Sequence, residues 1–232
     1  NGLLTSVVFL PLVGALFILL FAKGDRNIRL FAYGITLLDL ILAAWVFCIF
    51  DHHDSINRFQ LIDKFAWIGP DAIFDNDTFK ASYHLGIDGL STPLVLLTGI
   101  LGFCATLASR SIQVRVKEYF VWLLVLQTAV MGVFTSLDFL LFFLFWELEL
   151  IPMYMLISVW GTGRKEYSAM KFLIFTILGS AFMLVAIIAV YIMADIGTFD
   201  MLELTSHGLP GQTSLIPVSL IFWLFFAAFA IK

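Results

Sequence analysis

Seven long apolar runs dominate this sequence. They cover residues 3–22, 29–50, 85–109, 118–137, 138–160, 167–194 and 215–232. Each is about as long as a helix must be to cross the ~30 Å hydrocarbon layer, and a helix satisfies its own backbone hydrogen bonds there. Because 61% of the residues are hydrophobic and only 13% are charged, the chain has too little charge to cover a soluble domain. We therefore predict an all-α, polytopic transmembrane bundle of about seven helices, a single domain over residues 1–232.

The chain does not begin with Met and ends inside the last apolar run, so we expect residues to be missing at both ends. The first run is too long and continuous for a signal peptide, and no small-residue cleavage site follows it. The cysteines, Cys48 and Cys104, lie in apolar runs without CxxC spacing. Two buried thiols are therefore predicted, with a disulfide as the alternative.

Basic residues concentrate in alternate loops. The loops after the first, third and fifth runs carry Lys23, Arg26, Arg29, Arg110, Arg115, Lys117, Arg164 and Lys165. The turn at Asp138 and residues 195–214 contain neither Lys nor Arg, and residues 51–84 contain more Asp than basic residues. The positive-inside rule then places the basic loops in the cytoplasm and the N-terminus outside it.

Residues 51–84 form the one sizeable polar stretch and are predicted to be an extracytoplasmic loop. Two segments in it, 65–68 and 78–85, are rich in aromatic and β-favouring residues. This composition predicts a short β-hairpin.

Five ionisable residues lie within predicted membrane segments. They are Asp39, Glu147, Glu149, Lys171 and Lys232. A charge at the bilayer centre costs at least ~2.5–3.5 kcal/mol on insertion scales, so such residues usually face the bundle interior and mark an ion or proton path. We hypothesise that Glu147 transfers protons and that Glu149 shares this role. The alternative for either glutamate is a structural partner of a buried lysine, or a residue that snorkels at the lipid edge.

The two glutamates point in different directions. Glu147 and Glu149 lie about 200° apart, because successive helical residues turn by about 100°. Tyr154 falls on the face of Glu147. Pro152 has no N–H, which frees the carbonyl of Leu148 and predicts a bend. A freed carbonyl beside a carboxylate favours a small hydrated pocket.

Two lysines are candidates for the same path. Lys232 follows the apolar residues 215–231 and is predicted to lie deep. A lysine in apolar surroundings changes its charge easily, so a glutamate on a neighbouring helix would complete a two-state proton element. Lys171 lies about one turn inside the sixth run, and it either contributes to the path or snorkels to the surface.

Three further polar residues are assigned structural roles. Asp39 interrupts the second run without a visible partner, which favours a structural or interface role. Asp88, in the stretch HLGIDGLS, is predicted to be a charge at a helix N-terminus. His84 is a single interfacial histidine, which could change its charge but is more often structural.

The stretch WELELIPMY at residues 146–154 resembles the fifth transmembrane helix of subunit M of proton-pumping NADH:quinone oxidoreductase, respiratory complex I. It also resembles the equivalent subunit of the photosynthetic NDH complex of chloroplasts and cyanobacteria. Residues 84–91, 167–172 and 225–232 resemble the starts of the third and sixth helices and the seventh helix of the same family. The resemblance spans the whole chain, which would cover about the N-terminal half of such a subunit.

This resemblance implies a Mrp-antiporter-like module. In such a module, a fifth-helix glutamate and a seventh-helix lysine form a pair that drives proton movement. The matching positions are Glu147 and Lys232, and Lys171 matches a sixth-helix lysine near the path. Glu149 is the second glutamate of the motif, where other members carry an apolar residue.

The resemblance also implies a location and partners. The location is the bacterial inner membrane, or alternatively the thylakoid membrane, beside the antiporter-like siblings L and N and small membrane subunits. The chain has no GxGxxG, nucleotide loop, haem-type His pair or Cys cluster. We therefore expect it to bind no cofactor, metal or nucleic acid; NADH or ferredoxin, FMN, iron–sulfur clusters and quinone would act in partner subunits.

Quinone reduction in those subunits would drive protons through the Glu–Lys path. Two alternatives remain. One is a subunit of a multi-subunit Na⁺/H⁺ antiporter or a membrane-bound hydrogenase, and the other is a passive membrane scaffold.

Overall fold

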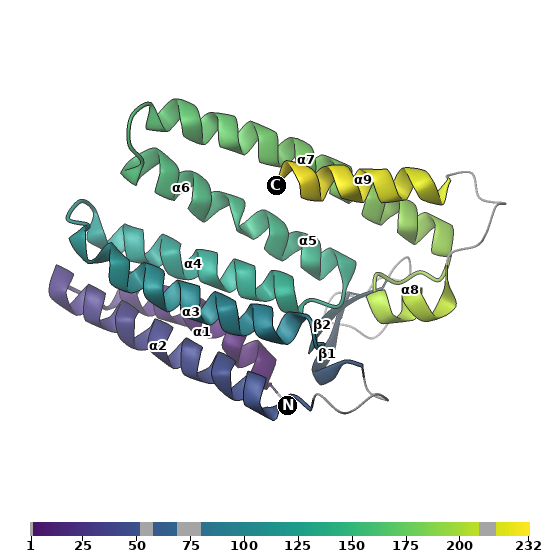
Figure 1. Cartoon of the computed structure of the whole chain (residues 1–232), viewed down its shortest axis with the longest axis horizontal. Coiled ribbons are helices and arrows are strands. Elements are labelled where there is room, and N and C mark those ends of the chain that lie inside the picture. The colour runs from purple at the N-terminus through teal and green to yellow at the C-terminus, as the bar shows by residue number, and fades with distance from the viewer. Residues whose placement is uncertain (1, 52–57, 69–79, 209–216) are drawn as a thin grey trace.

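The computed structural model describes residues 2–51, 58–68, 80–208 and 217–232. The elements in chain order are α1 (Leu3–Leu20), α2 (Asp25–Ile49), β1 (Gln60–Ile68), β2 (Ala81–Ile87), α3 (Ser91–Ala108), the 3₁₀ turn η1 (Ser109–Ser111), α4 (Val116–Thr135), α5 (Phe139–Leu148), α6 (Leu150–Trp160), α7 (Lys165–Ala194), α8 (Met201–His207) and α9 (Val218–Ile231). The long helices lie roughly side by side, with α1 to α4 on one side and α5, α6, α7 and α9 on the other (Figure 1).

The predicted all-α membrane bundle is confirmed. With α5 and α6 taken as one span, six helices of the described chain are long and apolar enough to cross a membrane. The seventh predicted run is represented by α9, a shorter apolar helix. Its first residues, 215 and 216, lie outside the described part of the chain.

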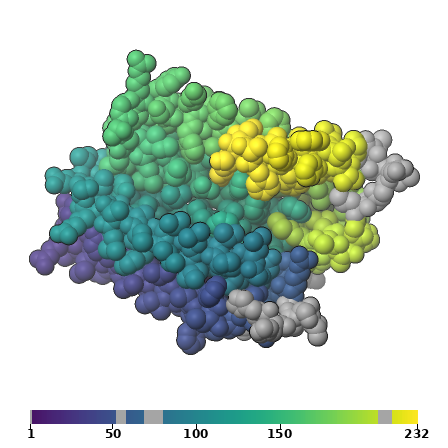
Figure 2. Space-filling view, viewed as in Figure 1, coloured from purple at the N-terminus to yellow at the C-terminus, as the bar shows by residue number. Residues whose placement is uncertain are grey.

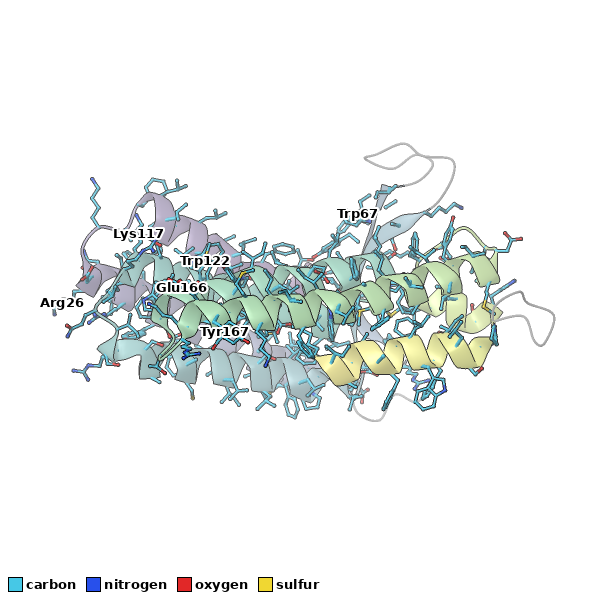
Figure 3. All side chains as sticks on the ribbon, turned by 90° about the horizontal axis from the view of Figure 1, so that it is seen from above. Arg26, Trp67, Lys117, Trp122, Glu166 and Tyr167 are labelled. Carbon is cyan, nitrogen blue, oxygen red and sulfur yellow. The ribbon has the colours of Figure 1, made fainter. Side chains whose placement is uncertain are left out.

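The two ends of the bundle differ in composition. Arg26 and Lys117 lie at one end, together with Glu166 and Tyr167, whereas Trp67 of β1 lies at the other (Figure 3). We call these the basic end and the hairpin end. The loops α1–α2, α3–α4 and α6–α7 lie at the basic end, and β1, β2 and α8 gather at the hairpin end (Figure 1). Loops that are successive in the chain therefore lie at alternate ends of the bundle, as their charges predicted.

The predicted hairpin is present, but it begins earlier and ends later than its two predicted segments. β1 pairs antiparallel with β2, with Asp63 opposite Leu85 and Lys64 opposite His84. Residues 69–79, which include the start of the second predicted segment, lie outside the described residues, as do residues 52–57. The predicted start of the third run at residue 85 was wrong, because β2 continues to Ile87 and α3 begins at Ser91.

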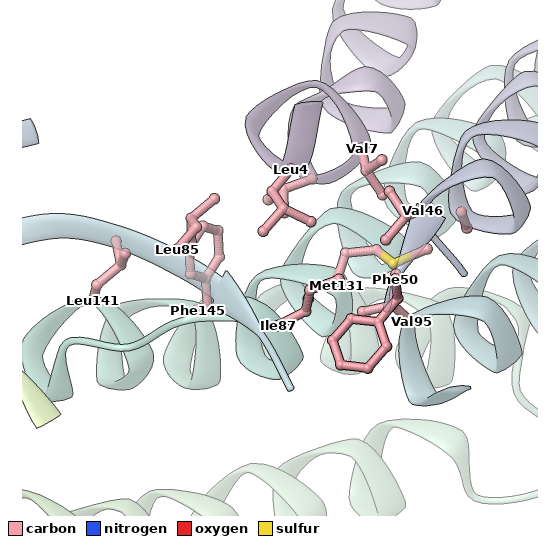
Figure 4. Close-up of a cluster of buried hydrophobic side chains, with 12 residues drawn as sticks. Leu4, Val7, Val46, Phe50, Leu85, Ile87, Val95, Met131, Leu141 and Phe145 are labelled. Atoms are coloured by element: carbon pink, nitrogen blue, oxygen red, sulfur yellow. The ribbon is translucent and has the colours of Figure 1, made fainter. Parts of the chain in front are cut away.

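A core of apolar side chains joins the hairpin to the helices. Figure 4 shows Leu85 and Ile87 of β2 among side chains from α1 to α5, such as Leu4, Met131 and Phe145. Leu85 and Ile87 have no exposed surface. The hairpin is thus anchored in the bundle, which explains why an apolar sequence at residues 85–87 is a strand.

Helix α9 lies on the surface of the bundle, against α7 (Figure 2). Its outer face carries the large exposed side chains of Phe222, Trp223, Phe226 and Phe229. The prediction of two buried thiols was wrong: Cys48 and Cys104 are free and exposed on the outside of the helices. Apolar sequence alone does not distinguish a side chain that faces lipid from one that faces the core.

Candidate functional site

Helices α5, α6 and α9 bring a lysine and a glutamate together. Lys232 Nζ lies 3.1 Å from Oε2 of Glu149, and the exposed fractions of the two side chains are 14% and 25%. The same ammonium donates a hydrogen bond of 3.1 Å to the carbonyl of Trp146 and lies 3.9 Å from the centroid of the Trp146 ring. The cation is therefore held by a carboxylate, a carbonyl and an aromatic face.

The cluster forms where the fifth span is interrupted. Helix α5 ends at Leu148, and α6 begins at Leu150, so Glu149 lies at the junction. Pro152 follows within the first turn of α6 and cannot donate to the carbonyl of Leu148. Glu149 itself keeps a right-handed helical backbone, and the amide of Met153 donates to its carbonyl across the junction. The bend expected from Pro152 stays a prediction, and the carbonyl of Trp146 lies beside the charged pair.

Helix α9 reaches the junction because α7 has a glycine where the two helices meet. A side-chain methyl at Gly179 would lie 3.1 Å from Cγ2 of Ile231 and 3.5 Å from the carbonyl of Ala228. Ile231 directly precedes Lys232. Gly179 therefore sets how closely the end of α9 approaches the bundle, as small residues do where membrane helices pack closely.

In this structure Lys232 contacts Glu149, whereas the resemblance implied a functional pair of Glu147 and Lys232, which stays a prediction. The physical reason is the angular separation of the two glutamates, because α9 approaches the side of the junction that Glu149 faces. Oε1 of Glu147 is buried and has no hydrogen-bond partner among the described residues. Glu147 is thus a half-buried glutamate with one buried, unpaired oxygen, next to a paired glutamate.

Lys171, the remaining member of the expected path, and Tyr154, expected on the face of Glu147, do not join this cluster through any hydrogen bond or ion pair that the described residues make. Lys171 is exposed on α7, as expected for a side chain that snorkels. Tyr154 is half-buried on α6. The structure shows no direct link from either side chain to Glu147.

Asp39 has a partner that the sequence did not suggest. Nε2 of Gln127 on α4 donates a hydrogen bond of 2.6 Å to Oδ2 of Asp39 on α2. Asp39 has no exposed surface, and Oδ1 of Asp39 and Oε1 of Gln127 have no partner among the described residues. The structural role expected for Asp39 agrees with this contact between two helices.

At the hairpin end, Asp200 joins the hairpin to the start of α8. Its Oδ2 lies 2.7 Å from Nζ of Lys64 and 2.8 Å from Nδ1 of His84, and its Oδ1 caps α8 by accepting from the amide of Leu202. Burial alone raises the pKa of the Asp200 carboxyl, but the hydrogen bonds from His84 and Lys64 outweigh burial and hold its pKa well below the usual range. The expected structural role of His84 agrees with this buried contact.

Asp138 connects the hairpin to the span that carries the glutamates. Oδ1 of Asp138 accepts from the amides of Leu140 and Leu141 at the start of α5. Its Oδ2 accepts from the amide of Ser82 on β2 at 3.0 Å. Asp88 caps α3 in a similar way, by accepting from the amide of Ser91 at 2.7 Å, which agrees with its predicted place at a helix N-terminus.

Sequence reasoning missed Lys64, Gln127, Asp138 and Asp200. Asp138 and Asp200 had a recognisable signal, because each directly precedes a helix as an N-cap residue. Nothing local in the sequence indicated the partners of Lys64 or Gln127. In the part of the chain that the structure describes, no three His, Cys, Asp or Glu residues lie close enough to hold a metal ion.

The fold and the cluster define a class: a polytopic helical membrane protein with a half-buried Lys–Glu pair at the junction of α5 and α6. Residues 136–232 match the family described as NADH:quinone oxidoreductase/Mrp antiporter, TM. This segment contains α5 to α9 and therefore the whole cluster. The resemblance expected from the sequence is thus confirmed.

Curated relatives resemble the chain over most of its length. NAD(P)H-quinone oxidoreductase chain 4-2 of Synechocystis is 39% identical over 87% of this chain and 34% of its own length. The chloroplastic chain 4 of Mesostigma viride is 37% identical over 99% and 43%. NADH-quinone oxidoreductase subunit M of Rickettsia prowazekii is 32% identical over 99% and 45%. The chain therefore spans less than half the length of these relatives.

Solved structures share the fold. A chain of respiratory complex I from Thermus thermophilus with bound NADH superposes with a TM-score of 0.79 at 22% identity, over 98% of this chain and 43% of that one. A chain of the archaeal membrane-bound sulfane sulfur reductase superposes with a TM-score of 0.71 at 18% identity, over 97% and 33%. The same arrangement of helices thus occurs in respiratory membrane complexes of different chemistry.

Proposed function

We propose that this chain is part of a proton-translocating membrane subunit of a quinone oxidoreductase complex related to respiratory complex I. The Lys232–Glu149 pair at the α5–α6 break is the observation that carries this proposal. The names of the relatives support the quinone-linked reaction over a free-standing Na⁺/H⁺ antiporter. Electron transfer would take place in partner subunits, which would hold NADH or ferredoxin, FMN, the iron–sulfur clusters and quinone.

Proton transfer would use the Lys232–Glu149 ion pair and the unpaired carboxyl group of Glu147. While Lys232 is paired with Glu149, the cation is stabilised and Glu147 remains without a partner among the described residues. A change elsewhere in the complex that separates Lys232 from Glu149 would leave both charges poorly solvated. A proton would then move to Glu149 or leave Lys232, and Glu147 would be the nearest further acceptor along the chain.

The direction of transport follows from the two ends of the bundle. Protons would enter from the basic end, which we place in the cytoplasm, and leave at the hairpin end. The N-terminus would then lie on the extracytoplasmic side. The neighbours would be the antiporter-like siblings L and N and small membrane subunits.

The test is proton pumping in inverted membrane vesicles that contain the full-length protein in its complex, with electron transfer followed separately. We expect Glu149→Gln and Glu147→Gln each to lower pumping by roughly ten-fold or more, with coupled electron transfer falling in parallel. Glu166→Gln, an exposed glutamate on α7 at the basic end, is the matched control and should leave pumping unchanged. Normal pumping by both site variants in an assembled complex would favour a passive scaffold.

A further inference from the structure

An open cavity of about 750 Å³ lies at the basic end, between the start of α2 and the end of α3. It is lined by Asp25, Arg26, Arg29, Leu30, Tyr33, Leu107 and Arg110. The lining thus contains three guanidinium groups and one carboxylate. It lies at the end of the bundle, where a membrane helix would meet the polar membrane surface. The cavity is remote from the Lys232 cluster, because α2 and α3 belong to the other side of the bundle (Figure 1).

Helical spacing places the cavity's side chains on one face. Arg26, Arg29 and Tyr33 are three and then four residues apart on α2, so they point in the same direction. Arg110 is contributed by η1, directly after α3. These arginines come from the start of α2 and from η1, and only packing of α2 on α3 makes them one site.

The guanidinium of Arg29 is held in place, but not all of its hydrogen-bond donors have an acceptor. Its Nη2 donates a hydrogen bond of 2.6 Å to the carbonyl of Ile112, which fixes the plane of the guanidinium. Its Nε is buried and has no acceptor among the described residues. A buried N–H without an acceptor is costly, so Arg29 keeps unused hydrogen-bonding capacity beside the cavity.

Arg26 and Arg110 have no carboxylate partner within ion-pair distance in the part of the chain that the structure describes. Arg115 differs: it belongs to the same end of the bundle but forms an ion pair with Glu118. The cavity therefore carries an excess of positive charge that the protein's own acids do not neutralise.

Apolar surface continues from the cavity toward the membrane interior. Leu30 and Leu107 line the cavity and are 69% and 44% exposed. Further along the same face of α2, Leu37 and Ile41 are also exposed. A ligand with a phosphate group and acyl chains matches this combination of a cationic head site and an apolar stripe.

We propose that the cavity binds an anionic phospholipid. The phosphate group lies among Arg26, Arg29 and Arg110, with the Tyr33 ring at the interface, and the acyl chains follow the exposed leucines of α2 and α3. Basic pockets between membrane helices bind anionic headgroups in this way, and arginine suits phosphate because its N–H groups form paired hydrogen bonds.

The test uses the full-length protein in its complex, reconstituted into vesicles that contain phosphatidylglycerol with a photoactivatable acyl chain. Peptide mapping should place the label on α2 and α3, and a matched phosphatidylcholine probe should give weak labelling there. The double variant Arg26→Gln/Arg110→Gln should reduce labelling by roughly ten-fold or more. Arg115→Gln, which removes a paired arginine from the same end, should label like the wild type.

Two further measurements keep the test decisive. Arg26→Lys/Arg110→Lys retains the charge, so partial labelling by this variant in an assembled complex separates loss of charge from misfolding. Equal labelling by both lipids, or normal labelling of the double Gln variant, would overturn the proposal. Absence of phosphatidylglycerol labelling, together with binding of inorganic phosphate that the double Gln variant loses, would show that the cavity takes the free anion instead of a lipid.

Discussion

Lys232 Nζ lies 3.1 Å from Oε2 of Glu149, although the two residues are far apart in the sequence. Their contact depends on two local features of the helices. Helix α5 stops at Leu148, and Gly179 lets the end of α9 approach α7. The pair thus joins the α5–α6 junction to the surface helix α9.

The first prediction concerns the energy of this pair. Glu149→Leu should lower the free energy of unfolding by about 1–3 kcal/mol, because it leaves a mostly buried ammonium without its carboxylate. Thermal unfolding of the purified complex measures the effect. The double variant Glu149→Leu/Lys232→Leu should be less destabilised than the sum of the two single variants, and strict additivity would show that the two residues do not interact.

The second prediction concerns Gly179. Gly179→Val should destabilise the subunit by about 1–3 kcal/mol, because the new side chain overlaps Ile231 and pushes α9 outward. Proton pumping should fall as well, since Lys232 follows Ile231 directly. Adding Ile231→Ala should restore part of the lost stability and part of the lost pumping. A double variant that is no more stable and pumps no faster than Gly179→Val would contradict this packing account.

The third prediction concerns the Asp39–Gln127 contact. Gln127→Leu should cost about 1–3 kcal/mol of stability, because the buried carboxyl group of Asp39 loses its hydrogen-bond donor. The double variant Asp39→Leu/Gln127→Leu removes both polar groups, so its stability should be closer to that of the wild type. Chemical denaturation in mild detergent compares the variants, and equal stability of Gln127→Leu and wild type would refute the prediction.

The fourth prediction concerns pH. The pKa of Asp200 is lowered in the folded protein, so its carboxylate contributes stability above the unfolded pKa of about 3.9, and that contribution is lost as pH falls toward the folded pKa. Asp200→Asn should therefore lower the melting temperature at neutral pH, with the difference from wild type shrinking below about pH 4. A difference that is constant with pH would exclude this carboxylate as its source. Glu203→Gln is the control, because Glu203 contacts the same Lys64 at 3.3 Å but is 55% exposed.

The membrane spans and their order follow from the sequence alone. Apolar runs of sufficient length have one stable form in a bilayer, so the positions of α1, α2, α4 and α7 were predictable. The bend expected at Pro152 rests on a local reason too, since proline removes one hydrogen bond from the helix. The candidate residues Glu147, Glu149 and Lys232 also follow from composition, because charges in apolar runs are rare and costly.

Only the tertiary structure decides which of these residues meet. The choice of Glu149 over Glu147 as the partner of Lys232 depends on how α9 packs on α7, and the partners of Asp39 and Asp200 come from segments distant in sequence. The exposed cysteines and the strand at residues 85–87 are two further cases in which an apolar sequence alone did not predict the environment or the secondary structure. Hydropathy records how apolar a segment is, whereas its neighbours in space determine whether a given side chain faces lipid, core or another charge.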